Sequence, residues 1–410
     1  MKLLTGNAVV GQSGGPTSAI NATLCGVVDR ASISSSIKTL YGMKNGIEGL
    51  INEELIDLSY LYVSEELLSV LEATPSSALG SCRKRLPNIS EDSELYEKII
   101  DIFKKYDIRY FFYIGGNDSM DTVCKINRYA RICHYEINVI GIPKTIDNDL
   151  VLTDHTPGYG SASKYISTTI KEIARDTSAY RCKAVTIVEI MGRDTGWLTA
   201  SAGLPKHFGA DGADLIYLPE LCFDNGNFIF ALNNQFLKKP NVVVAVSEGI
   251  RYSDGKYVGE GAQNNVTDPF GHKYLAGTAK ILEKLVREQI GCKVRSVELS
   301  LPQRCASHIA SDTDITESRQ IGSYAVECAE NNISGKMVGF RRKKGKYQIE
   351  LISADVGEIV NKVKYVPREY INSEGNNVTN ECMEYIAPLI LGERNIKYEN
   401  GLPVHFKIRG

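Results

Sequence analysis

The stretch that decides the fold is NVIGIPKTIDND, residues 138–149. Its first half is apolar and rich in β-branched side chains, and its second half is polar. Continuous apolar runs of this length are typical of strands buried on both faces, as in a parallel sheet. We predict such strands at Asn7–Val10, Arg109–Ile114, Asn138–Ile142, Ala184–Ile190 and Asn241–Val246.

Helix-period segments separate these runs. In Ser161–Arg175 the apolar residues fall on one face of a helix, and Gly277–Ile290 follows the same pattern. Strands that alternate with amphipathic helices indicate βαβ units. The sequence therefore predicts an α/β fold with mostly parallel sheets.

A polar, glycine-bearing segment follows each predicted strand. These segments are GQSGGPT (11–17), GGNDS (115–119), PKTIDND (143–149), MGRDTG (191–196) and SEG (247–249). Ligands of open α/β sheets bind outside the carboxyl ends of the strands. The segments together predict one composite site.

The glycines of the first segment favour an anion. Gly11, Gly14 and Gly15 precede a helical pattern that begins near Thr17. Glycine lets the backbone approach a ligand closely, and a helix N-terminus offers free N–H groups to a phosphate. An ordinary strand–helix turn is the alternative. The dinucleotide pattern GxGxxG is not met at this strand, which argues against a nicotinamide oxidoreductase.

Carboxylates and cations follow the same strands. Asp147 and Asp149 project to one side if the chain is extended, and Asp118 follows a neighbouring strand. Such carboxylates hold Mg²⁺ or accept a hydroxyl proton, although Asp-Asn-Asp is also good turn chemistry. The cations beside glycine- or proline-marked segments are Arg83, Lys144, Arg193, Arg295 and Arg304. Phosphoryl transfer needs such cations, whereas any single arginine is more often a solvated surface residue.

The composition excludes several classes of protein. The 410 residues carry a net charge of −2, so we expect neither nucleic-acid nor membrane-surface binding. The ten cysteines form no CxxC pair, which indicates reduced thiols. The N-terminal apolar run is too short for a signal peptide, and no run approaches the ~20 residues of a membrane span. We expect a cytoplasmic protein.

The motifs GQSGGPTSAIN, GGNDS, PKTIDND, MGRDTGW and the QR at Arg304 resemble those of phosphofructokinases, in the same order. The resemblance covers roughly residues 5 to 315. It implies two Rossmann-like three-layer α/β domains with the active site in the cleft between them. We expect residues 1–157 plus about 303–360 to form the phosphoryl-donor domain, 158–302 the sugar-phosphate domain, and 361–410 an extension of unknown placement.

The resemblance also implies a role for each matched residue. Asp147 is similar to the base that takes the proton from the 1-hydroxyl of fructose 6-phosphate, with Lys144 and Arg83 as catalytic cations. The donor-binding positions are Gly11, Gly14, Gly15, Gly116, Asp118 and Ser119. The sugar-phosphate positions are Thr145, Ile146, Asp147, Asp149, Met191, Gly192, Arg193, Glu248, Arg295 and Arg304. Arg295 matches an arginine that reaches into a neighbouring subunit, which implies a homo-oligomer, a dimer or a tetramer.

Two positions favour pyrophosphate over ATP as the donor. ATP-using members resemble GGDGS and PGTIDND, whereas this chain has Asp118 and Lys144 in place of the two variable glycines. A carboxylate at 118 would crowd and repel the α-phosphate of a nucleotide, and Lys144 would supply charge to a bare pyrophosphate. The implied reaction is reversible transfer to fructose 6-phosphate in glycolysis or gluconeogenesis. An ATP-dependent enzyme and a non-catalytic sugar-phosphate-binding regulatory subunit remain alternatives.

The implied cofactor is Mg²⁺. Asn117 stands where many members have a metal-binding aspartate, so we assign the metal to Asn117 and Asp118, with Asp147 and the phosphates as further ligands. A basic stretch at Lys336–Tyr347 is interpreted as a solvated hairpin or loop. The residues after about Val360 carry no interpretable motif.

Overall fold

A computed structural model describes residues 4–261 and 277–408 of the chain. Its larger sheet has the strand order β11-β10-β5-β4-β1-β2-β3. The inner strands are parallel, and β3 and β11 join antiparallel at the two edges. The strands are β1 (Gly6–Gln12), β2 (Ile37–Met43), β3 (Leu55–Asp57), β4 (Ile108–Gly115), β5 (Asn138–Pro143), β10 (Lys336–Arg342) and β11 (Ile349–Asp355).

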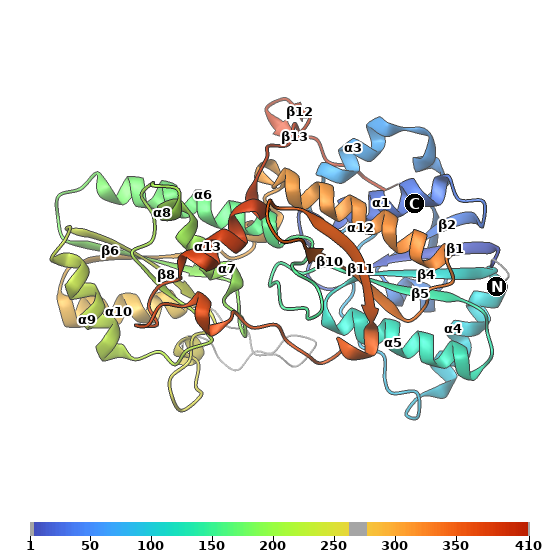
Figure 1. Ribbon diagram of the computed structural model, residues 1–410, viewed down its shortest axis with the longest axis horizontal. Helices are drawn as coiled ribbons and strands as arrows, with labels where there is room; N and C mark the ends of the chain where they lie inside the picture. Colours follow the sequence, from blue (N-terminus) through green and yellow to red (C-terminus); the bar gives the residue numbers. More distant parts are fainter. Residues whose placement is uncertain (1–3, 262–276, 409–410) are drawn as a thin grey trace.

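Helices cover both faces of this sheet (Figure 1). The first face packs against α1 (Ile20–Ser32), α3 (Glu65–Ala73) and α12 (Asp312–Glu330), with the 3₁₀ turn η1 (Ser59–Val63) beside them. The second face packs against α2 (Ile47–Ile51), α4 (Ser93–Lys105) and α5 (Asn117–Ile132). Val10 and Phe112 point into the first core, and their neighbours Val9 and Phe111 point into the second. The strands are apolar without interruption because both of their faces are buried.

The smaller sheet is parallel throughout, in the order β7-β8-β6-β9. Its strands are β6 (Ala184–Ile190), β7 (Leu215–Tyr217), β8 (Asn241–Ser247) and β9 (Lys293–Glu298). One face packs against α6 (Tyr159–Ser178), α7 (Trp197–Ala200), η2 (Ser201–Gly203), α8 (Leu204–His207) and α13 (Asn380–Ile386); the other packs against α9 (Asn225–Phe236), α10 (Thr278–Ile290) and η3 (Val258–Gly261). The predicted strands and mostly parallel sheets are confirmed.

The chain passes between the two sheets repeatedly. After β9 it returns through α11 (Pro302–Cys305) and η4 (Ser307–Ile309) to α12, which packs along α1. Each sheet lies within one of the ranges expected for the two domains, so we keep that division as a proposal. The parts of those ranges at 1–3, 262–276 and 409–410 lie outside the described residues.

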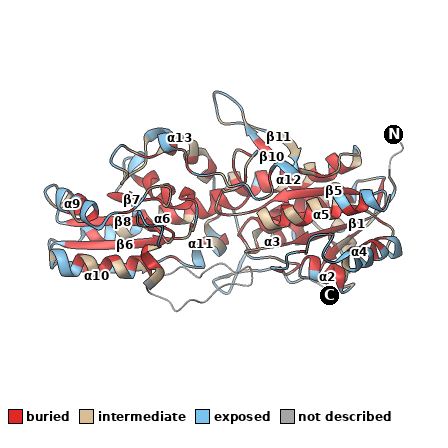
Figure 2. Ribbon diagram, turned by 90° about the horizontal axis from the view of Figure 1, so that it is seen from below, coloured by how far each residue is buried: buried red, intermediate tan, exposed pale blue. Residues whose placement is uncertain are grey.

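The C-terminal segment packs on both units (Figure 1). After η5 (Val356–Glu358) the chain crosses to the smaller sheet, where η6 (Arg368–Tyr370), α13 and η7 (Ala387–Ile390) bury Ile371, Met383 and Leu389 in its core. It then turns back through β12 (Tyr398–Glu399) and β13 (Leu402–Pro403), and Phe406 packs against the core beneath α1. Residues that carried no motif thus complete the core of one unit and pack against the core of the other. Figure 2 shows the central strands of both units buried, with exposed residues on the helices around them.

The interpretation of Lys336–Tyr347 as solvated was wrong for its first half. Lys336–Arg342 is the strand β10, in which Val338 and Phe340 are buried. The turn that follows does form an exposed hairpin, closed by a hydrogen bond from Lys343 N to Gln348 O at 2.9 Å. The sequence did not indicate the strand because its basic residues cluster at the C-terminal end of the strand.

Two further findings concern membrane spans and cysteines. Among the described residues, none of the helices is both long and apolar enough to span a membrane. All ten cysteines are free thiols.

Candidate active site

A cleft of about 900 Å³ lies at the carboxyl ends of strands from both sheets. Most of the predicted site residues line it: Gly14, Gly15, Arg83, Gly116, Asn117, Asp118, Ser119, Lys144, Thr145, Ile146, Asp147, Asp149, Met191, Arg193, Glu248 and Arg304. The structure therefore brings segments that are up to 290 residues apart, from Gly14 to Arg304, into one cavity.

The loop after β1 is built around two cations. Gly14 has φ 77°, and a Cβ added there would lie 3.3 Å from Lys144 Nζ. Lys144 donates a hydrogen bond from Nζ to Gly15 O at 2.6 Å. A Cβ on Gly15 would lie 3.2 Å from Arg304 Nη1. A side chain at either position would crowd the end of a cation by a few tenths of an ångström, so the two glycines keep the loop backbone close to both charges.

Burial weakens the charge of the central lysine. Lys144 is 3% exposed. Its burial lowers the pKa to about 8; the neighbouring Asp147 opposes that shift, and Arg304 and Arg83 add to it. Burial also lowers the pKa of Arg304, with Arg83 contributing to the same shift. Lys144, Arg83 and Arg304 line the same cavity and disfavour one another's charge, so an anion that binds between them would stabilise their charged forms.

The segment after β5 is a turn, the alternative that the Asp-Asn-Asp pattern indicates, and not an extended run. Asn148 has φ 53°, in the left-handed region that asparagine tolerates. Thr145 fixes the turn by accepting from Asp147 N at 3.1 Å. The two carboxylates nevertheless line the same cleft. We call residues 145–149 the catalytic turn.

The environment of these carboxylates favours their neutral forms. Burial raises the pKa of Asp147, against the opposing effects of the Thr145 hydroxyl and the Arg193 and Lys144 charges. Burial and the charge of Asp147 raise the pKa of Asp149 to about 7. Perturbed carboxylates in a cleft are typical of acid–base sites.

The smaller unit contributes a second acidic group. Gly192 has φ 136° and donates from its N–H to Glu248 Oε1 at 3.3 Å. Burial raises the pKa of Glu248 to about 8. Gln303 accepts from Met191 N at 3.1 Å and thereby fixes the loop that carries Met191 and Arg193.

The first turn of α5 holds the residues predicted to bind metal. Asn117 is engaged by the C-terminal segment: its Nδ2 donates to Lys362 O at 2.8 Å, and its Oδ1 accepts from Asn361 N at 2.9 Å. Asp118 lies in the same turn and lines the cleft. Within residues 4–261 and 277–408, no group of three or more His, Cys, Asp and Glu side chains is placed to hold a metal ion.

Three predicted residues do not line the cleft: Gly11, Gly192 and Arg295. Gly11 lies in β1, and a Cβ there would lie 2.4 Å from Met43 Cε, so this glycine leaves room for the packed Met43 side chain. Arg295 is exposed on the edge strand β9, with Asp176 3.8 Å away.

The sequence interpretation missed several lining residues. They are Ser13, Pro16, Thr17, Lys84, Glu189, Ile190, Asp194, Thr195, Glu298, Ser300, Leu301, Gln303, Asn361 and Val363. Lys84 follows Arg83 directly, and Asp194 and Gln303 lie inside motifs given above. Their position beside predicted site residues could therefore have identified them. Asn361 and Val363 follow the last recognisable motif, and nothing in the pattern marks them.

The fold and the cleft are those of a phosphoryl-transfer enzyme, and the chain belongs to the phosphofructokinase family, which residues 7–329 match. It is 37% identical over 97% of its length to the pyrophosphate–fructose 6-phosphate 1-phosphotransferase of Halomonas elongata and 38% identical over the same share to that of Methylococcus capsulatus, covering 94% of each. The solved pyrophosphate-dependent phosphofructokinase of Nitrosospira multiformis superposes with a TM-score of 0.89 at 36% identity, over 98% of this chain and 96% of that one. The predicted family is confirmed.

Proposed function

We propose that this protein transfers a phosphoryl group reversibly from pyrophosphate to the 1-hydroxyl of fructose 6-phosphate, giving fructose 1,6-bisphosphate and phosphate. The observation that carries the proposal is the position of Lys144 against Gly14 and Gly15, because this places a cation directly under the donor loop. The names of the similar proteins support the same donor and acceptor.

The acceptor hydroxyl is activated by Asp147. The ionised carboxylate takes the proton of the 1-hydroxyl while the hydroxyl oxygen bonds to the terminal phosphorus of pyrophosphate. The bond from that phosphorus to the bridging oxygen breaks, and phosphate leaves. Lys144, Arg83 and Arg304 neutralise the charge on the phosphoryl group in transfer. Thr195 helps to fix Asp147 within the catalytic turn, because its Oγ1 donates to Asp147 O at 3.2 Å.

The donor is selected by charge and space. Asp118 lies in the first turn of α5 and lines the cleft. We infer that it faces the position at which a nucleotide donor would carry its α-phosphate. Repulsion and crowding there disfavour ATP, and Lys144 compensates for the adenosine contacts that pyrophosphate lacks. The sugar phosphate is bound by Met191, Arg193 and Glu248 from the smaller unit.

The family uses a divalent metal, and we propose Mg²⁺. Mg²⁺ is commonly bound by one or two carboxylates together with substrate phosphates, so a three-residue protein site is not required. Asp118 and Asp147 are suitable carboxylates, whereas both groups of the Asn117 carboxamide already bond to the backbone of 361–362. Bound Mg²⁺ would neutralise pyrophosphate.

Assembly and location are also proposals. Arg295 lies on an exposed strand edge, outside the cleft of its own chain, which suits a residue that completes the site of a second copy in a homo-oligomer. The ten free thiols fit the reducing cytoplasm.

The test is a coupled assay of purified protein with fructose 6-phosphate and Mg²⁺, comparing pyrophosphate with ATP. We expect turnover with pyrophosphate. Turnover with ATP alone would overturn the reading of Asp118 and Lys144 and keep the family. Activity with neither donor would favour the non-catalytic alternative or another acceptor sugar.

A further inference from the structure

We propose that Lys364 is a positioning residue that holds the catalytic turn from outside the cleft, as part of a strap formed by residues 361–366. The inference rests on the proposed function and deepens it, because it adds to the active site a segment beyond the family match at residues 7–329. Lys364 does not line the cleft, so it acts through the turn.

The strap runs from the larger unit to the smaller unit (Figure 1). At its start, the backbone of Asn361 and Lys362 is bonded by the Asn117 side chain in the larger unit. At its end, Val366 N donates to Glu220 Oε1 at 3.0 Å in the smaller unit. Between these anchors, Asn361 and Val363 line the cleft itself.

Both backbone groups of Lys364 are used at the centre of the strap. Its N–H donates to Asp149 O at 2.7 Å, within the catalytic turn. Its carbonyl accepts from Trp197 Nε1 at 2.8 Å, on the first residue of α7. The residue thus ties the turn to the smaller unit through its main chain alone.

The side chain of Lys364 reaches under the turn. Nζ donates to Asn148 Oδ1 at 3.0 Å, to Asp154 O at 2.8 Å and to Thr153 O at 3.3 Å. These bonds use all three donors of the ammonium group. Burial lowers the pKa of Lys364 to about 7, while Asp154 and Asp149 oppose the shift and Arg342 adds to it.

Asn148 is the link between the strap and the carboxylates. It is fully buried and left-handed, and it separates Asp147 from Asp149. Its Oδ1 accepts from Lys364, and its Nδ2 donates to Tyr385 Oη at 2.9 Å. Both side-chain anchors of this residue therefore come from the C-terminal segment. A catalytic group displaced by about 1 Å can lose 10²-fold in rate, so these anchors matter to turnover.

The experiment compares Lys364→Met with Lys344→Met, a matched change at an exposed lysine of the 343–348 hairpin. With pyrophosphate, Lys364→Met should lower kcat at least about tenfold while KM for fructose 6-phosphate changes less than about threefold. Lys344→Met should match the wild-type protein, and Lys364→Arg should recover part of kcat because it keeps charge and donors. A kcat for Lys364→Met within twofold of wild type would overturn the proposal.

Tyr385→Phe tests the same link by itself and remains measurable if Lys364→Met does not fold; the double variant applies where Lys364→Met folds. It removes only the hydroxyl that accepts from Asn148 and donates to Asp154 O. We expect a lower kcat at similar KM, and in the double variant a loss smaller than the product of the two single losses, because both act through Asn148. An unchanged kcat, or fully independent effects, would contradict the inference.

Trp197 separates failure of this inference from failure of the proposed function. It is the only tryptophan of the chain, and the Lys364 ammonium lies 5.4 Å from its ring centroid. Its fluorescence reports the strap without any substrate. If the wild-type protein is inactive with both donors, the proposed function fails. An emission change in Lys364→Met then still supports the strap, whereas unchanged emission overturns it.

Discussion

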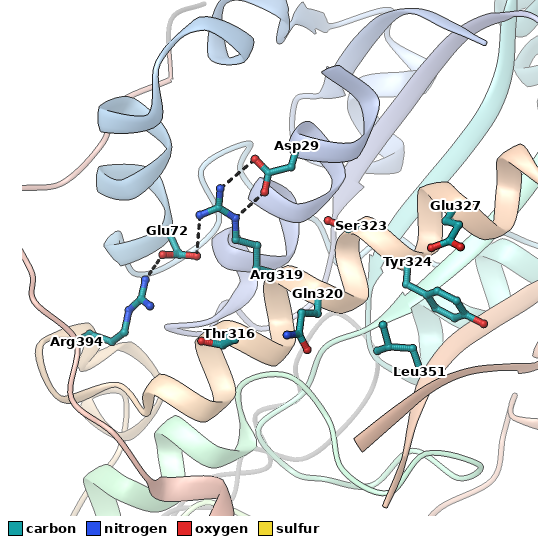
Figure 3. A pocket seen from close by; sticks show the side chains of 10 residues that line it. All are labelled: Asp29, Glu72, Thr316, Arg319, Gln320, Ser323, Tyr324, Glu327, Leu351 and Arg394. Carbon is teal, nitrogen blue, oxygen red and sulfur yellow. Dashed lines mark hydrogen bonds and ion pairs between the residues drawn. The ribbon is translucent and has the colours of Figure 1, made fainter. Parts of the chain in front are cut away.

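Two cavities of this protein contain arginines that face acids, and they differ in how the charges are matched. The active-site cleft is one. The other, which we call the side hollow, is a cavity of about 540 Å³ lined by Asp29, Glu72, Thr316, Arg319, Gln320, Ser323, Tyr324, Glu327, Leu351 and Arg394. Figure 3 shows its arginines turned toward its acids.

In the side hollow Asp29 and Glu72 are paired with the two arginines. Arg319 bonds both oxygens of Asp29, at 2.5 and 3.0 Å, and approaches Glu72 at 3.5 Å. Arg394 bonds Glu72 from the opposite side (Figure 3). In the cleft, by contrast, Lys144 donates to a backbone carbonyl and Asp147 accepts from the Thr145 hydroxyl at 3.4 Å. The comparison teaches that the pairing of the charges, rather than the cavity volume, distinguishes the two cavities. In the active-site cleft the charged side chains bond to neutral groups, whereas in the side hollow they pair with one another and only link helices.

The largest expected effect separates the two cavities directly. Asp147→Asn should lower kcat by about two or more orders of magnitude, the range of a lost general base, with little change in substrate KM. The measurement is the coupled pyrophosphate assay. The matched change Asp29→Asn, in the side hollow, should leave kcat near the wild-type value. Near-normal turnover of Asp147→Asn would remove Asp147 from its role.

The next effect concerns the donor. The double variant Asp118→Gly with Lys144→Gly should shift the ratio of kcat/KM for ATP to that for pyrophosphate toward ATP by at least about tenfold, which is 1.4 kcal/mol. Under the proposed function, it removes the carboxylate expected to repel a nucleotide and the charge expected to bind pyrophosphate. Asp29→Gly serves as the control. A ratio that does not move would show that these residues do not select the donor.

A smaller effect is expected in the pH profile. Because the pKa of Lys144 is lowered to about 8, its charge is present below that pH and lost above it, and pyrophosphate-dependent kcat/KM should fall as the pH rises through about 8. The raised pKa of Asp147 moves the acid limb upward, since activity requires the ionised base. Lys144→Arg stays charged and should move only the alkaline limb to higher pH. An alkaline limb that stays in place would assign it to another group.

The smallest effect on activity is expected in the side hollow. Arg319→Met should lower the free energy of unfolding by about 1–3 kcal/mol, because it removes charged hydrogen bonds between α12, α1 and α3. Urea unfolding measures this change, and kcat should stay within twofold. A loss of kcat without a loss of stability would show that the side hollow is a functional site, and it would contradict the distinction between the two cavities.

The sequence predicted the elements whose signal is local. The apolar run at Asn138–Ile142 became β5, and the polar residues after it became the catalytic turn. The orientation of Asp147 and Asp149 was not predictable, because it depends on the left-handed Asn148, which tertiary contacts stabilise.

The strap was not predictable for a different reason. Lys364 binds the turn and Trp197 through its backbone N–H and carbonyl, which every residue except proline possesses. No residue type or spacing at 361–366 marks such contacts. Likewise, Val338 and Phe340 became core only because β10 pairs with β5, a contact far apart in sequence.

That late pairing has a consequence for synthesis. The edge of β5 that receives β10 is complete at Pro143, whereas β10 begins roughly 190 residues later, at Lys336. At about 5–20 residues per second, a ribosome needs about 10–40 s to cover that interval. Throughout it, the backbone donors and acceptors of a central strand lack the neighbour that will pair with them, and α12 is not yet available to cover α1. The order of the strands in the sheet thus sets a period in which the nascent chain is most dependent on chaperones.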